Sequence, residues 1–142
     1  ELDIAADLAT CLPDLPEHLG WAHVVIARAG ASTLAELTVA GRPAILVPLP
    51  TATDDHQTAN AREITLAGGA RTIPQSRFTP SELAKQMQKL GLDPEALANA
   101  AGRARACGKP DAARDLADLV ESLDAPRSAL PVGPVVRKEA FA

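Results

Sequence analysis

Two polar segments carry the side chains most able to bind a ligand. In the first, Arg28-Ala29-Gly30-Ala31-Ser32-Thr33, small residues surround a glycine that is expected to permit a tight turn. Backbone N–H groups at a helix start carry partial positive charge, so a helix beginning here would suit a phosphate. Glu36, one turn later, could accept two hydrogen bonds from vicinal hydroxyls such as those of a ribose. The alternative is a turn with a Ser/Thr cap and a solvated glutamate, since no complete P-loop or GxGxxG pattern is present.

The second polar segment covers residues 48–60. Its prolines stiffen it, and four polar side chains cluster where a helix is expected to begin: Asp54, Asp55, His56 and Gln57. These groups could bond sugar hydroxyls, and the alternative is a polar helix cap. A metal site is disfavoured, because one histidine and adjacent acids rarely converge on one ion. We therefore expect no bound metal.

Composition and the other reactive residues exclude several classes of function. Aromatic residues are 2% of the chain and the net charge is −4, which argues against a nucleic-acid partner. No apolar run approaches the ~20 residues of a membrane span. Cys11 and Cys107 share no metal-ligand spacing, and no residue stands in a nucleophile elbow. His18 and His23 are interpreted as surface or partly packed residues, and no cofactor is predicted.

The elements that must position the polar segments alternate along the chain. Apolar, β-branched runs predict strands at 24–27 and 44–47, both buried on two faces, and a short third strand at 70–73. Helical spacing and glycine stops predict the helices. These span residues 15–19 (capped by Asp14 and ended by Gly20), 33–40 (ended by Gly41), 55–67 (ended by Gly68), 80–90 (begun by a capping box at Thr79), 94–107 and 111–123.

This order predicts an α/β fold with a parallel sheet and flanking helices. Ligands of such sheets bind beyond the carboxyl ends of the strands, where both polar segments are expected. Three strands make a narrow sheet for so many helices, so strands are missing upstream or one is hidden in the N-terminal segment. The first residue is Glu rather than Met, which favours a processed or partial chain. Residues 1–123 are assigned to a partial domain and residues 124–142 to a flexible tail.

The two polar segments, taken with their flanks, resemble the donor-binding region of the MurG family of bacterial glycosyltransferases. The similarity is carried by residues 22–37, by residues 41–61 with their Asp-Asp-His-Gln run, and by Ala-Gly-Gly-Ala at 67–70. Similar runs follow at 103–105 and 110–113. The resemblance covers roughly residues 11–122.

The resemblance implies a Rossmann-like parallel sheet with flanking helices, the C-terminal half of a GT-B glycosyltransferase, incomplete at its N-terminus. It further implies transfer of N-acetylglucosamine from UDP-N-acetylglucosamine to the C4 hydroxyl of the muramoyl sugar in lipid I. That reaction gives lipid II with inversion and uses no metal held by a DxD motif. The expected setting is peptidoglycan synthesis, with peripheral association at the cytoplasmic face of the bacterial inner membrane.

Carried over by position, the resemblance also implies a set of donor contacts. Glu36 would bind the ribose hydroxyls, and Leu12 would lie at the uracil. Gln57 would bond the hydroxyls of the N-acetylglucosamine ring, with His56 beside it. The remaining implied contacts form one run, of which the first three residues would line the diphosphate: Ala31, Ser32, Thr33, Leu34 and Ala35.

From this resemblance, the chain is expected to be without the family's N-terminal domain, which would supply the lipid I pocket, the membrane-facing patch and the catalytic base. No catalytic residue is therefore assigned, and the chain alone is predicted to be inactive. One alternative is a non-catalytic UDP-sugar-binding subunit that needs a separate membrane-bound, acceptor-binding partner. Another is a plain α/β interaction domain without a nucleotide site.

Overall fold

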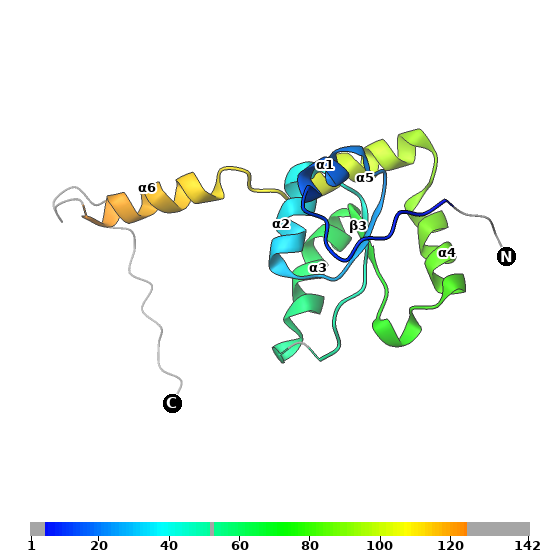
Figure 1. Ribbon diagram of the computed structural model, residues 1–142. Coiled ribbons are helices and arrows are strands. Elements are labelled where there is room, and N and C mark those ends of the chain that lie inside the picture. The colour runs from blue at the N-terminus through cyan, green and yellow to red at the C-terminus, as the bar shows by residue number, and fades with distance from the viewer. Residues whose placement is uncertain (1–4, 52, 125–142) are drawn as a thin grey trace, which may run out of the picture. The chain divides into compact units, whose positions relative to one another are not determined.

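The computed structural model describes residues 5–51 and 53–124, which fall into two compact units. The first unit extends to Lys109 and contains the sheet (Figure 1). The second begins at Pro110, and its described part contains helix α6 (Ala112–Asp124). Helix α6 exposes a set of aliphatic side chains: Leu116, Leu119, Val120 and Leu123. The tail predicted over 124–142 lies outside the described residues from position 125 onward.

The sheet confirms the predicted parallel α/β arrangement. Its strands are β1 (Val25–Ala27), β2 (Ala44–Leu46) and β3 (Ala70–Thr72), ordered β1-β2-β3 with both pairings parallel. Helix α2 (Ala31–Ala40) connects β1 to β2, and α3 (His56–Ala67) connects β2 to β3. All three strands therefore end at the same edge of the sheet, as the sequence predicts.

The other helices of the first unit are α1 (Leu15–Trp21), α4 (Pro80–Leu90) and α5 (Pro94–Ala106). Short 3₁₀ turns at Thr53–Asp55 and Gln75–Arg77 precede α3 and α4.

The predicted end of α1 at Gly20 is wrong, because the helix continues to Trp21. Arg42 explains the extension: its guanidinium donates to the carbonyl oxygens of Gly20 (2.7 Å) and Ala22 (3.3 Å). A cation at a helix carboxyl end satisfies carbonyls that lack helical partners. The predicted Asp14 side-chain cap is absent, although Asp14 is the N-cap residue.

The capping box predicted at Thr79 forms in part. Thr79 Oγ1 accepts from the backbone N–H of Glu82 at 3.2 Å. The Glu82 carboxylate instead accepts from Gln86 Nε2 at 2.7 Å, and this bond lowers the pKa of Glu82, with Lys85, Arg77 and Lys89 adding attraction. The backbone N–H of Glu82 therefore caps the start of α4, whereas its carboxylate bonds to a residue one turn further along the helix.

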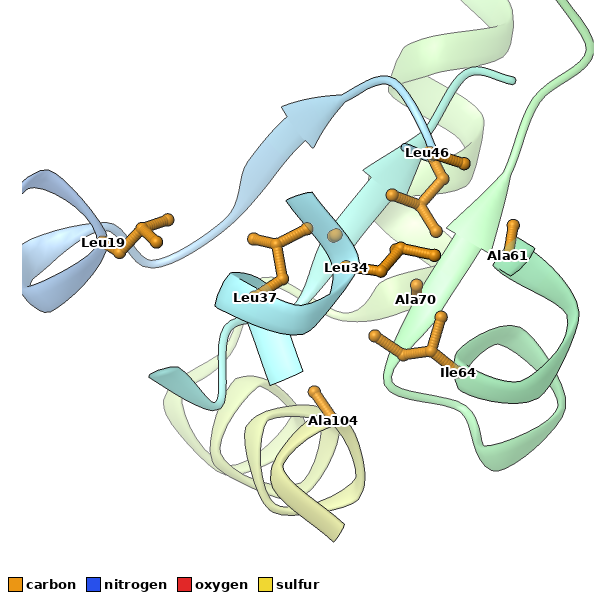
Figure 2. Packing of buried hydrophobic residues seen from close by; sticks show 10 residues of the cluster. Leu19, Leu34, Leu37, Leu46, Ala61, Ile64, Ala70 and Ala104 are labelled. Carbon is orange, nitrogen blue, oxygen red and sulfur yellow. The ribbon is translucent and has the colours of Figure 1, made fainter. Parts of the chain in front are cut away.

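Strand β2 is the centre of the core. Ala44 and Leu46 pack into one apolar cluster with residues from α1, α2 and α3, among them Leu37 and Ile64 (Figure 2). Ile45, on the opposite face, packs into a second cluster with residues of α4 and α5. The prediction that β1 is buried on both faces is wrong, because Ile26 is 48% exposed.

Helix α5 reaches the sheet through an unusually close backbone contact. A Cβ built on Gly69 would lie 2.7 Å from both Cα and N of Ala104. Ala104 is fully buried in the same cluster as Ala44 and Ala70. Aromatic residues are only 2% of the chain, so the core is not filled by large aromatic side chains. It is packed densely because small residues allow the helix and the sheet to approach closely.

Replacing Gly69 with alanine should separate α5 from the start of β3. We expect Gly69→Ala to lower the free energy of unfolding by about 2 kcal/mol, because the added methyl meets backbone that cannot rotate away. Urea denaturation followed by far-UV circular dichroism measures the change. Gly102→Ala is the matched control, since a Cβ there meets nothing within 4 Å and alanine favours the helix. Equal stability of the Gly69→Ala and wild-type chains would contradict this packing.

Candidate functional site

The carboxyl edge of the sheet gathers both polar segments of the sequence. Residues 28–30 leave β1 and enter α2, and residues 47–55 leave β2 and enter α3. The segment after β3, residues 73–79, leaves at the same edge. Loops far apart in the sequence are thus brought together by parallel pairing.

The first loop opens directly into α2. Gly30 is the N-cap residue and no side chain caps the helix. The first helical bond runs from the N–H of Leu34 to the carbonyl of Gly30 at 3.0 Å. The preceding N–H groups, those of Ala31, Ser32 and Thr33, have no acceptor within the helix and carry its positive end. This arrangement can bind an anionic group.

Helix α2 begins two residues before the predicted start at Thr33, so Ser32 and Thr33 lie in its first turn rather than capping it. The tight turn expected at Gly30 is also wrong. Its backbone (φ −65°, ψ 148°) is extended and open to any residue. A Cβ at Gly30 would meet only Thr33 Oγ1, at 3.7 Å. The glycine therefore leaves space beside that hydroxyl.

The implied donor contacts on α2 differ in accessibility. Ser32, Ala35 and Glu36 are exposed, and Thr33 is half-buried. Glu36 follows Ser32 by one turn, so both project from the same face of the helix. Leu34 differs, because its side chain is buried in the core beneath the helix (Figure 2). It packs α2 onto the sheet and presents no side-chain group to a ligand.

Gln57 and Asn60, on the first turns of α3, hold the two loops together. Gln57 Oε1 accepts from the backbone N–H of Ala29 at 3.2 Å and from that of Leu49 at 3.0 Å. Asn60 Nδ2 donates to the carbonyl of Ala29 at 3.3 Å. The sequence marks both residues as polar but gives no sign of these partners.

Arg28 also belongs to the site, although its place in the sequence did not predict a role for it. Its Nη1 donates to the carbonyls of Val47 (3.1 Å) and Pro48 (3.4 Å). The guanidinium thus joins the ends of β1 and β2 and places a positive charge at this edge. The sequence signal that could have indicated this role is a cation that directly follows an apolar strand and shortly precedes a glycine.

The second loop contains an unusual backbone. Asp54 (φ 53°) and Asp55 (φ 52°) are both left-handed, a conformation that aspartate tolerates better than most residues. Asp55 lines a hollow of about 460 Å³ together with Pro48, Thr58 and Gln75. This hollow lies between the ends of β2 and β3.

The remaining predicted positions are exposed. His56 is the first residue of α3 and is exposed, and Leu12, which precedes α1, is 46% exposed. Across residues 5–51 and 53–124, no three His, Cys, Asp or Glu side chains are grouped as metal ligands would be. In the same described ranges, every helix is too short or too polar to cross a bilayer.

The family of the chain follows from its comparison with known proteins. Residues 1–119 match the glycosyltransferase family 28 C-terminal domain, which is most of the chain. The chain belongs to this family. Its parallel sheet with flanking helices is the C-terminal part of the GT-B arrangement.

Several curated proteins are closely similar in sequence to the chain. One is a UDP-N-acetylglucosamine--N-acetylmuramyl-(pentapeptide) pyrophosphoryl-undecaprenol N-acetylglucosamine transferase from Zymomonas mobilis, which is 65% identical over 121 residues. That match covers 85% of the chain and 31% of the relative. A protein of the same name from Sphingopyxis alaskensis is 59% identical, over 89% of the chain and 32% of the relative. The family 28 chain thus spans about a third of the length of these relatives.

Solved structures show the same fold. The crystal structure of Acinetobacter baumannii MurG matches 82% of the chain and 33% of its own, with TM-score 0.76 and 35% identity. Spinosyn forosaminyltransferase SpnP matches 89% of the chain and 33% of its own, with TM-score 0.61 and 23% identity, a likeness of fold alone.

Proposed function

We propose that the chain is the donor-nucleotide part of an N-acetylglucosaminyltransferase. The whole protein would transfer N-acetylglucosamine from UDP-N-acetylglucosamine to lipid I, the undecaprenyl-linked acceptor, and so form lipid II in peptidoglycan synthesis. The names of the close relatives support both substrates. The observation that carries the proposal is the uncapped start of α2 with Glu36 one turn beyond it.

Each group at this site has a chemical task in the proposed reaction. The positive end of α2 receives the diphosphate and stabilises the charge that UDP gains as the glycosidic bond breaks. Glu36 accepts hydrogen bonds from the ribose hydroxyls, and exposed Leu12 covers the uracil. Gln57 and His56 lie at the neighbouring helix start, where the sugar would extend from the diphosphate. These placements follow the resemblance residue by residue.

The acceptor half of the reaction requires groups from outside this chain. A base must take the proton from the acceptor hydroxyl, and none is assigned among the described residues. The preceding part of the whole protein is proposed to provide it, together with lipid I binding and peripheral attachment to the inner membrane on its cytoplasmic side. Strand β1, which forms one border of the described sheet and exposes Ile26, offers a pairing edge for that part.

A non-catalytic UDP-sugar-binding subunit with a separate acceptor-binding partner would use the same site. Strand β1's exposed Ile26 is compatible with either arrangement.

Removal of the Glu36 carboxylate should weaken nucleotide binding without unfolding the chain. We expect Glu36→Ala to lower the affinity for UDP at least tenfold, because two hydrogen bonds to a charged acceptor are lost. Isothermal titration calorimetry with UDP measures the change. Glu95→Ala, an exposed glutamate on α5, is the matched control. A folded wild-type chain that does not bind UDP would instead favour the interaction domain.

Gly30→Ala should separate folding from binding at the start of α2. The extended backbone accepts alanine, so the unfolding free energy should fall by no more than about 1 kcal/mol, the cost of alanine at an N-cap. The new methyl would stand beside Thr33 Oγ1 and hinder the diphosphate, lowering UDP affinity about tenfold. Thermal unfolding and UDP titration test the two halves separately. If Gly30→Ala binds UDP as tightly as the wild-type chain, the diphosphate does not bind at the start of α2.

The chain by itself should not catalyse transfer. With lipid I and UDP-N-acetylglucosamine we expect no lipid II above background, because the lipid I pocket and the catalytic base are proposed to lie in the preceding part of the whole protein. Thin-layer separation of radiolabelled lipid products measures this. Formation of lipid II by the isolated chain would show that it holds a complete active site.

A further inference from the structure

The hollow between the ends of β2 and β3 is formed by residues other than the implied donor contacts. We call it the β2–β3 hollow. Its volume of about 460 Å³ lies within the range of small-ligand sites. Polar side chains reach it from the start of α3 and from the segment after β3, namely those of Asp55, Thr58, Gln75 and Ser76. All of these residues are exposed, so a ligand can reach them from solvent.

Among the described residues that line the β2–β3 hollow, Asp55 alone carries a charge. An aspartate at an N-cap normally accepts a hydrogen bond from the first turn of its helix. Asp55 is the N-cap residue of α3, but its side chain makes no such bond. Its backbone is left-handed (φ 52°), whereas a capping residue is normally extended. Within residues 5–51 and 53–124 no cation pairs with this carboxylate, which is therefore available to a ligand.

The other groups that line the hollow suit a peptide. The hydroxyls of Thr58 and Ser76 and the amide of Gln75 can donate to peptide carbonyls and accept from peptide N–H groups. Thr72 also lines the hollow, but its hydroxyl already pairs with that of Thr65 at 2.9 Å. Apolar surface comes from three rings, those of Pro48, Pro50 and Pro74. A short peptide with an ammonium group is thus complementary to the hollow in polarity and in charge.

The proposed reaction brings a peptide to this edge of the sheet. The name of the Zymomonas mobilis relative describes its acceptor as an N-acetylmuramyl-(pentapeptide) compound. A muramoyl sugar carries its peptide on the lactyl group at C3, and the hydroxyl expected to react is on C4, the next carbon. Asp55 precedes Gln57, a proposed contact of the donor sugar, by two residues. The peptide would therefore leave the acceptor sugar beside the reacting hydroxyl and near the β2–β3 hollow.

We propose that the β2–β3 hollow binds the peptide of the acceptor, with the Asp55 carboxylate attracting an ammonium group on that peptide. The identity of the molecule that carries the peptide rests on the proposed function. The peptide site itself does not, because the hollow and its carboxylate belong to the described chain. Asp55 would then contribute to the choice of acceptor and not to the binding of the donor.

Synthetic pentapeptides test this site on the chain itself. The probe is N-acetyl-Ala-Ala-Lys-Ala-Ala-amide, whose only charge is the lysine ammonium, and its norleucine analogue lacks that charge. Amide NMR spectra follow Thr58, Gln75 and Ser76 during the titration. Asp55→Asn removes the carboxylate charge but keeps the side-chain shape and a residue that tolerates the left-handed backbone. Asp54→Asn is the matched control, because Asp54 is also left-handed and exposed but does not line the hollow.

We expect the lysine peptide to shift the amide signals of Thr58, Gln75 and Ser76 with a dissociation constant on the order of 1 mM. Asp55→Asn should weaken this binding about threefold, which is typical of the loss of an exposed ion pair, and Asp54→Asn should leave it unchanged. The norleucine peptide should bind the wild-type chain as weakly as the lysine peptide binds Asp55→Asn.

The absence of shifts at these three amides, or an equal loss of binding in Asp54→Asn and Asp55→Asn, would overturn the site. Equal binding of the lysine and norleucine peptides would overturn the role of the carboxylate. Titration of the same samples with UDP separates this inference from the proposed function. A chain that binds UDP but no peptide refutes the peptide site alone, whereas one that binds the peptide but not UDP keeps the site and refutes the proposed function.

Discussion

The site depends on the burial of β2 between two parallel neighbours. Every residue of this strand is buried, and its side chains alternate between two apolar clusters, with Ala44 and Leu46 on one face and Ile45 on the other. A shift of the strand by one residue would exchange these faces, so the register is strongly fixed. Because both pairings are parallel, the same register brings the ends of all three strands to one edge. The loop that contains Gly30 and the start of α3 with Gln57 meet only for that reason.

Much of the fold could be predicted because its signals are local. Left-handed Gly41 and Gly68 end α2 and α3 where their positions in the sequence indicate. The exposure of Ile26 could not be predicted, because a buried strand and a border strand have the same apolar composition when nothing shows their neighbours. The end of α1 also escaped prediction, since the cation that extends it, Arg42, lies 22 residues from Gly20.

The candidate site divides in the same way. A helix start after β1 and Glu36 one turn further on follow from the order of residues along one segment, although the helix begins two residues earlier than predicted. The partners of Gln57 do not, because they are backbone groups, and any residue type would present the same N–H. Arg28 illustrates the same limit: its acceptors are two main-chain carbonyls of the next strand's end. A side chain that positions a site by bonding to backbone atoms cannot be predicted from the sequence, because its partner can be any residue type.

Trp21 has a consequence for how this protein can be observed. The chain has one tryptophan and no tyrosine, so nearly all of its near-ultraviolet absorbance and emission comes from a single indole. That indole is 70% exposed at the end of α1, with the His18 ring centred 6.1 Å away. Its fluorescence therefore reports water and the imidazole beside it rather than the buried core. Loss of the core could leave the emission nearly unchanged, and a spectroscopically silent unfolding should be expected.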